Sequence, residues 1–454
     1  MPKCTQSAPD ALQFGRIGRK RIEANFNGGE LSSDGGLLLL KAVDERVGLT
    51  RAAAAAVKDR RDPDLIEHPL HTLLSQRIFG ICCGYEDLND HAVLRLDGLM
   101  QTAVSRECAL GSAPTLCRLE NAVTASDCVA LSGLLMDQFI GSFAKASPPE
   151  QIVLDVDASD IPLHGDQEAR QFHGYYDSYC YLPLYVFCGD HLLAAYLRNS
   201  RIDGAKNVTA LIKVLVRRIR QSWPEVRIIV RGDSGFCRQR LLRWCEKERI
   251  GYVIGLARNE RLHQQVEWAE LDMKERFEAS GEKQREIGEF VYAAKSWDRA
   301  RRVVTRLEYG EQGINPRFIV TNIPESSVDA NALYDGFYCK RGEAENRIKE
   351  AQLDLFGTRT SCHRFMANQF RLLLSALAYT LMQALKRHAL AGSELARATS
   401  ATIRCRLLKI GASIIKNTRR IVLMLASNHP LRELFALAAA RLTSSPRESA
   451  FALP

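Results

Sequence analysis

Apolar residues recur at helical spacing over the first third of the chain. After the breaker Gly35-Gly36, the run 37–40 begins an apolar face that Val43 and Val47 continue. This spacing of three to four residues predicts helices from about residue 32 to residue 145. The segment Ser112–Thr115 predicts a helix start, because a capping serine precedes an early proline. Residues 1 to about 25 lack this period and are rich in arginine and lysine, so we predict a basic, irregular arm there.

A different pattern begins near Ile152. Short runs rich in β-branched and aromatic residues now alternate with amphipathic helical stretches. The pattern predicts a strand, a hairpin, a helix, a strand, a helix and a strand, at 152–157, 182–197, 207–220, 226–230, 241–248 and 252–256. This order favours a mixed α/β sheet with an antiparallel edge.

The rhythm changes again after Arg258. Three β-prone runs, at 290–292, 302–304 and 317–320, predict a β-rich insertion, and helices resume at about Ala330 and continue to the end. The predicted units are a basic arm, a helical region, a first core part, the insertion, a second core part and a basic helical C-terminal region. Their bounds are 1–30, 31–148, 149–258, 259–329, 330–390 and 391–454.

Composition and charge narrow the class of partner. With 46% hydrophobic and 25% charged residues the chain is typical of a folded soluble protein, and no apolar run is long enough to predict a membrane span. The formal net charge of +9 favours an anionic partner such as nucleic acid, although mild basicity also serves solubility alone. The candidate DNA-contacting residues are Arg118, Arg217, Arg218, Trp297, Arg301, Arg302, Arg404, Arg406 and Lys409.

The thirteen cysteines do not predict a metal site. They are scattered, no C-x-x-C pair occurs, and scattered thiols fit a reducing cytosol. His164 and His173 have no ligand partner at a suitable spacing, so we interpret them as loop histidines.

Three carboxylate positions are the strongest candidates for chemistry. Asp157 ends the predicted strand 152–157, and Asp155 faces the same way because it lies two residues earlier. Asp233 follows the strand 226–230 between two glycines, and Glu345 lies in a predicted helix. Each acid alone also fits a turn cap or a surface ion pair. Together they can hold two hard cations such as Mg²⁺ or Mn²⁺, which would assist an in-line displacement at phosphorus.

These residues also carry a family resemblance. The chain resembles bacterial insertion-sequence transposases of the DDE type with a ribonuclease H-like core, specifically the insertion-sequence family thirteen-eighty. That family has a Tyr-x2-Arg-x3-Glu-x6-Lys signature, and Tyr338, Arg341 and Glu345 occur at its spacing, with Gln352 in the place of the lysine. The segments LDVDASD, RGDSGF, YVIGLARN and SSDGGLLLL extend the resemblance over essentially the whole chain.

The resemblance implies a role for each of these residues. Asp157, Asp233 and Glu345 would be the catalytic metal ligands for two ions, with Asp155 as the alternative first ligand. Tyr338 and Arg341 would contact the DNA end, and Lys349 would take over the phosphate contact of the missing lysine. The implied fold is a ribonuclease H-like mixed sheet interrupted by a β-rich insertion, with helical terminal regions. The helical region 31–148 would bind the DNA ends.

The implied activity is DNA transposition in the cytoplasm of a bacterium, at the nucleoid. The implied partners are double-stranded DNA, both the terminal inverted repeats and the target, and a second copy of the chain in a synaptic homodimer. Two alternatives remain open at this stage. One is a nuclease with the same carboxylates that cuts without joining, and the other is a DNA-binding transposase remnant that has lost catalysis.

Overall fold

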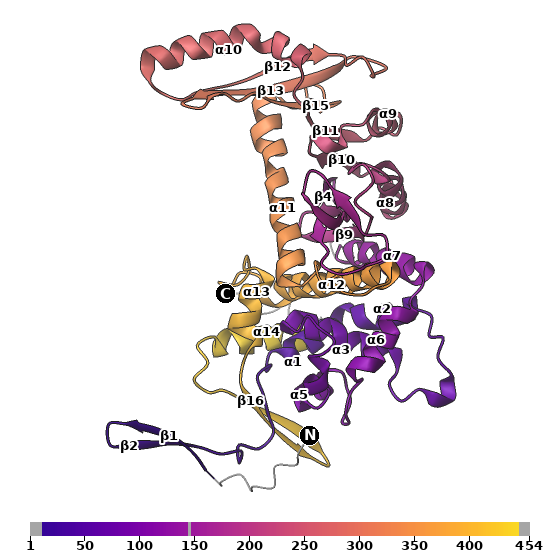
Figure 1. Ribbon diagram of the computed structural model, residues 1–454, viewed down its shortest axis with the longest axis vertical. Coiled ribbons are helices and arrows are strands. Elements are labelled where there is room, and N and C mark those ends of the chain that lie inside the picture. Colours follow the sequence, from indigo (N-terminus) through magenta and orange to yellow (C-terminus); the bar gives the residue numbers. More distant parts are fainter. Residues whose placement is uncertain (1–10, 144–146, 445–454) are drawn as a thin grey trace.

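The structure is a computed structural model that describes residues 11–143 and 147–444 of the chain. Figure 1 shows an elongated molecule with a layer of helices at one end, a large sheet in the middle and a helix-covered ribbon at the other end. Residues 1–10 of the predicted basic arm and residues 445–454 of the predicted C-terminal region lie outside the described residues.

The central feature is one sheet of nine strands with mixed directions. Strand β4 runs parallel to β10, and β10 runs parallel to β11, whereas the other neighbours are antiparallel. The order is β12-β13-β15-β11-β10-β4-β8-β9, and the short β14 pairs with β13. The strands are β4 (Gln151–Ala158), β8 (Leu184–Cys188), β9 (His191–Tyr196), β10 (Arg227–Gly232), β11 (Gly251–Leu256), β12 (Gln284–Tyr292), β13 (Arg301–Gly310), β14 (Gly313–Ile314) and β15 (Arg317–Thr321).

Helices cover both faces of this sheet. On one face lie α8 (Val208–Ser222) and α9 (Gln239–Lys247), and on the other lies the helical segment that contains α11 (Arg341–Lys349), as Figure 1 shows. The face of α8 that carries Ile212, Leu215 and Ile219 is buried against the strands. This one-sided apolar stripe is the pattern expected of a helix packed on a sheet.

The helical layer at one end is built around α12 (Phe365–Leu385), which is buried over nearly its whole length. It packs on α3 and α7 of the N-terminal region and on β9 of the sheet, so it joins the two parts of the molecule. The other helices of this layer are α1 (Leu37–Val47), α2 (Leu49–Ala56), α3 (Leu70–Cys83), α4 (His91–Leu94), α5 (Gly98–Ala103), α6 (Ala113–Ala122), α7 (Ala125–Gly141), α13 (Ser400–Ile403) and α14 (Arg432–Thr443). Among the described helices none alone has the length and apolarity to cross a membrane, and only α6 and α7 counted together, bent by 94°, pass that test.

The predicted mixed α/β class is confirmed, and each element predicted from 152 to 256 is found in the predicted order. The prediction missed a small separate sheet between the first strand and the hairpin, which consists of β5 (Ile161–Pro162), β6 (Gln171–His173) and β7 (Ser178–Tyr181). The three β-prone runs after Arg258 lie in β12, β13 and β15, which extend the central sheet through the β11–β15 pair. The pattern missed α10 (Glu260–Ser280), a mostly exposed helix that packs on β13. Its apolar face is narrow, with only Leu262, Val266 and Met273 buried, so the periodic signal is weak.

Two predicted segments are corrected. The arm is not irregular, because β1 (Leu12–Ile17) and β2 (Lys20–Ala24) form an antiparallel hairpin. The C-terminal region is not helical throughout, because β16 (Ala412–Asn417) and β17 (Arg420–Leu425) form a second hairpin, which pairs with β3 (Leu31–Ser32). Both hairpins combine β-branched residues with a turn of Gly or Asn, a local signal that the basic character of the segments obscured.

Candidate active site

Two aspartates meet at one edge of the central sheet. In the parallel pair of β4 and β10, Val156 lies opposite Gly232, so Asp157 and Asp233 are the next residues of adjacent strands. Strand order and register therefore bring together two side chains that are far apart in the sequence. This edge is the carboxyl end of parallel strands, where ligands commonly bind in open α/β sheets.

The turn after β10 is held in place by its own aspartate and by a glycine on the neighbouring strand. The Asp233 carboxylate accepts a hydrogen bond of 2.8 Å from the Gly235 amide and so caps the short turn Ser234–Phe236. A Cβ at Gly255 of β11 would lie 2.7 Å from the Ser234 amide nitrogen and 2.8 Å from the Tyr338 hydroxyl. Gly255 is thus required for the close approach of Tyr338 to the Asp233 turn.

The third carboxylate comes from α11. Glu345 follows Arg341 by one helical turn, and the Arg341 Nη1 lies 2.5 Å from a Glu345 oxygen and 3.8 Å from an Asp157 oxygen. Arg341 therefore links the acid on the helix to the acid on β4. Since Tyr338 lies beside the Asp233 turn, the Tyr-Arg-Glu positions of the sequence signature all face the carboxyl edge of the sheet.

Charge repulsion and burial raise the proton affinity of this site. Burial, and after it the negative charge of the neighbouring Asp233, raise the pKa of the Asp157 carboxyl to about 7, although Arg341 opposes this shift. Burial also raises the pKa of the Tyr338 hydroxyl, so Tyr338 is a neutral hydrogen-bond donor at physiological pH. A carboxylate cluster that one arginine only partly neutralises is a place where a cation gains binding energy.

Asp155, the alternative first ligand, has a different environment. Its two oxygens accept hydrogen bonds of 2.5 and 2.8 Å from Arg231, and both side chains are buried. Burial raises the pKa of the Asp155 carboxyl even though Arg231 opposes this shift. The Arg231 guanidinium also donates to the Phe337 carbonyl, which connects β10 to the helical segment of Tyr338. Asp155 therefore has its charge neutralised within the fold.

The carboxylates of this site are the type of ligand that a divalent cation needs, but side chains would have to move before a cation could bind. Carboxylate oxygens are the ligands that Mg²⁺ and Mn²⁺ prefer, and Asp157, Asp233 and Glu345 supply only such oxygens. Across the residues that the structure describes, no three His, Cys, Asp or Glu side chains converge closely enough to hold an ion. At this edge Arg341 pairs with Glu345. A bound cation would have to replace that contact.

Comparison with known proteins identifies the class of enzyme. A family model described as "Transposase DDE domain group 1" matches residues 14–447. The chain belongs to this family. The protein is thus a DDE transposase, an enzyme that cuts DNA and transfers strands, and such enzymes use divalent metal ions. A solved structure titled as a piggyBac transposase synaptic complex with hairpin DNA is similar at a TM-score of 0.39 and 12% identity, over 83% of this chain and 80% of that chain. No curated protein matches.

Two hollows of the transposase flank Asp233. The larger, of about 690 Å³, is lined by Asp233, Glu345, Tyr338 and Arg341 together with Arg258, Arg306 and Arg317. The smaller, of about 270 Å³, is lined by Asp157 and Asp233 together with His173, Tyr175 and Tyr176. Sequence reasoning missed the three arginines of the larger hollow. Arg258 had a usable signal, because it lies just past the end of β11, at the same edge of the sheet as Asp157 and Asp233.

The last signature position of the transposase is buried beside the end of β4. Gln352 is buried in a π-helical turn, Glu350–Asp354, that follows α11. Its amide oxygen accepts a hydrogen bond of 3.3 Å from Ser159, and its amide nitrogen lies 3.5 Å from the Tyr185 hydroxyl. Gln352 thereby ties the helical segment to the end of β4. Lys349, the predicted substitute for a signature lysine, is exposed.

Most of the predicted DNA-contacting residues have partners within the fold. Arg301 is 5% exposed and pairs with Glu246 and Asp298, and its guanidinium lies 5.2 Å from the centre of the Trp297 ring. The remaining partners are Glu289 for Arg302, the carbonyls of Ile81, Cys82 and Asp354 for Arg404, Asp34 for Lys409, Asp137 for Arg218 and Glu394 for Arg406. Arg217 is exposed on α8.

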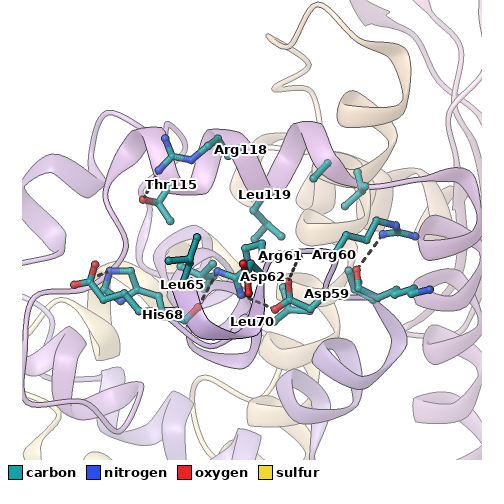
Figure 2. Close-up of a pocket in the computed structure, with 16 residues that line it drawn as sticks. Asp59, Arg60, Arg61, Asp62, Leu65, His68, Leu70, Thr115, Arg118 and Leu119 are labelled. Carbon is teal, nitrogen blue, oxygen red and sulfur yellow. Dashed lines mark hydrogen bonds and ion pairs between the residues drawn. The ribbon is translucent and has the colours of Figure 1, made fainter.

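Arg118 lies at a separate hollow in the helical layer. This hollow, of about 480 Å³, lies between α6 and the segment 57–73 and has a largely apolar lining. Figure 2 shows Arg118 along α6 beside Thr115, whose hydroxyl accepts a hydrogen bond of 3.2 Å from it. Figure 2 also shows Arg61 paired with Asp59 at the same hollow. None of the three catalytic candidates lines it, so the hollow is no part of the carboxylate site.

Proposed function

We propose that Asp157, Asp233 and Glu345 are the catalytic ligands of two Mg²⁺ or Mn²⁺ ions in this transposase. The observation that carries the proposal is the register of β4 and β10, which makes Asp157 and Asp233 neighbours at the edge that Glu345 faces. When bound, the ions would activate the attacking oxygen and neutralise the leaving oxygen at the scissile phosphate. Asp155 is the weaker candidate, because Arg231 already neutralises it.

The surrounding side chains would bind and orient the DNA. Arg341, released from Glu345, can form a bidentate contact with a phosphate, and Tyr338 can donate a hydrogen bond from its protonated hydroxyl. Arg258, Arg306 and Arg317 line the same hollow and offer further phosphate contacts. Gln352 holds the helical segment against the end of β4, so we assign it a positioning role in place of the lysine's phosphate contact.

The proposal includes a ribonuclease H-like core. The order β9-β8-β4-β10-β11, with three antiparallel strands followed by two parallel ones, supports it. We further propose membership of the insertion-sequence family thirteen-eighty, action at the nucleoid in a bacterial cytoplasm, and a synaptic homodimer that joins terminal inverted repeats to target DNA. The sequence signature at Tyr338, Arg341 and Glu345 supports these finer assignments.

The test is cleavage of labelled DNA that carries the element's own ends, in Mg²⁺ or Mn²⁺. Asp233→Asn and Glu345→Gln should each lower cleavage at least a thousandfold while binding of the ends persists. Glu343→Gln is the matched control, since Glu343 is an exposed acid two residues before Glu345 on the same helix. Unchanged cutting by both site variants, or equal loss in the control, would reject these ligands.

A further inference from the structure

The hairpin β1–β2 stands apart from the rest of the fold. Its two strands pair only with each other, and Figure 1 shows them extending from the helical end of the molecule. Every residue from Gln13 to Leu31 is exposed. An isolated two-stranded hairpin is marginally stable in water, because one strand pair buries little apolar surface. A hairpin of this kind is better suited to contact a partner than to support the fold.

The strand register places like charges opposite each other. Arg16 lies directly across from Arg21, and Arg19 and Lys20 lie at or beside the turn that joins the strands. Among the described residues, none of these four cations forms a hydrogen bond through its side chain or an ion pair. Like charges at directly opposed positions destabilise a strand pair. An anion bound between Arg16 and Arg21 would remove the repulsion between their side chains.

The backbone of the hairpin is shaped for a twisted ribbon. A bulge at Phe14-Gly15 interrupts the register, and Gly15 has a φ of +87° that favours glycine. Gly18 begins the turn with a φ of +61°, as expected for a short hairpin loop. Bulges increase local twist, and a twisted two-stranded ribbon has a size that the major groove of DNA admits.

The charge balance decides between two kinds of partner. The stretch from Arg16 to Glu23 holds four cations and one acid, and Glu23 already accepts a hydrogen bond from Gln13. The other face carries Ile17 and Ile22, which a second protein copy could cover, together with Lys20, which lies directly across from Ile17. The unpaired cations at the tip and in the middle of the hairpin favour a polyanion over an apolar protein surface.

A second hairpin with exposed arginines lies at the same helical end of the molecule. β16 pairs with β3, which follows the first hairpin in the chain, so both hairpins are anchored at the helical end (Figure 1). The turn of β16–β17 carries Arg419 and Arg420, both exposed. This placement gives two basic ribbons at the end of the molecule opposite the β12–β13 ribbon.

We propose that β1–β2 is a DNA-binding ribbon that holds duplex DNA through phosphate contacts of Arg16, Arg19, Lys20 and Arg21. The proposal rests on the assigned transposase activity and adds a second DNA contact, outside the carboxylate site. Phosphate contacts position DNA without reading its sequence. The ribbon therefore holds the element's end and unrelated duplexes alike, and leaves sequence recognition to other parts of the chain.

The experiment measures the affinity of the full chain for two labelled duplexes, the element's end and an unrelated sequence, over a series of salt concentrations. Arg16→Gln/Arg21→Gln should weaken binding of both duplexes about tenfold or more and lower the slope of log affinity against log salt by about 2. Glu23→Gln, on the same face, is the opposite-sign control and should not weaken binding.

Two outcomes would overturn this inference. The first is an affinity and salt slope that the double variant leaves unchanged. The second is an unchanged affinity together with a loss of dimer mass in light scattering, which would assign the hairpin to a second copy. Neither outcome affects the assignment of the carboxylates as metal ligands, because that assignment is tested by whether Asp233→Asn still cleaves DNA. Conversely, if Asp233→Asn still cleaves DNA while Arg16→Gln/Arg21→Gln binds DNA more weakly, only the assignment of the carboxylates is rejected.

Discussion

Two regions of the central sheet differ in how far their charged side chains are neutralised by neighbours of opposite charge. At the carboxyl edge of β4 and β10, Asp157, Asp233 and Glu345 share a single arginine, Arg341. On β13, Arg301 has Glu246 at 2.7 Å and Asp298 at 2.9 Å. A neutralised cluster stabilises the fold, whereas a cluster left partly unneutralised costs stability and is typical of a functional site. The two clusters therefore differ in their local charge balance, and the density of charge along the sequence does not show this difference.

The largest effect should follow from removal of the cation on β13. Arg301→Ala removes the arginine that lies nearest to Glu246 and Asp298, and it removes the contact with the Trp297 ring. We expect the free energy of unfolding to fall by about 3 kcal/mol, because breaking a buried pair leaves an uncompensated charge. Urea unfolding monitored by tryptophan fluorescence measures it.

The matched control is Arg299→Ala, since Arg299 is a neighbouring exposed arginine at longer distances from the same acids. It should change the free energy of unfolding by less than about 1 kcal/mol. A loss of DNA affinity by folded Arg301→Ala, with stability retained, would contradict the structural role and return Arg301 to the DNA-contacting set.

The next effect compares two aspartates on one strand. Asp155→Asn deprives the buried Arg231 of its bidentate partner, so we expect it to lower the free energy of unfolding by about 2–3 kcal/mol. Asp157→Asn should instead raise that free energy by on the order of 1–2 kcal/mol in metal-free buffer at pH 8, while it abolishes cleavage. Thermal unfolding in a chelator, beside the cleavage assay, measures both.

The sign of the Asp157 effect follows from its raised pKa. A carboxyl with a folded-state pKa of about 7 binds its proton more tightly in the folded protein than in the unfolded chain, where the value is near 3.8. Ionisation therefore costs stability as pH rises from about 4 to 7. The advantage of Asp157→Asn should disappear near pH 4. Equal stability of the variant and the native protein at pH 8 would show that Arg341 fully neutralises the cluster.

The sequence predicted the parts of this comparison that depend on local pattern. The strand that ends at Asp157 and the turn at Asp233 are visible because β-branched runs stop at carboxylates. The helical signature predicted that Arg341 and Glu345 share a face, and they lie 2.5 Å apart. These elements depend on residues within a few positions of each other, so period and spacing are sufficient.

What the sequence did not reveal depends on long-range pairing. Asp155 and Asp157 are equivalent by alternation along the strand, and only the approach of Arg231 from β10 separates them. The same holds for Arg301 and Arg404, which form basic clusters in the sequence but find acids or carbonyls that are distant along the chain. The β1–β2 hairpin was missed for another reason, because its charged residues masked a short strand pattern.

The smallest expected effect is on the pH dependence of stability, and it comes from His191, a histidine that burial keeps neutral. The His191 ring packs edge-on against Phe139 with centroids 5.1 Å apart, and burial lowers the pKa of His191 to about 3. Below pH 6.5 the unfolded chain binds a proton at this position and the folded protein does not, so stability falls as pH decreases. His191→Phe should make the melting temperature less sensitive to a change from pH 7 to pH 5.5. His164→Gln, at an exposed histidine, should leave that sensitivity unchanged. If both variants keep the native pH dependence, His191 is protonated in the fold, and burial does not keep its ring neutral.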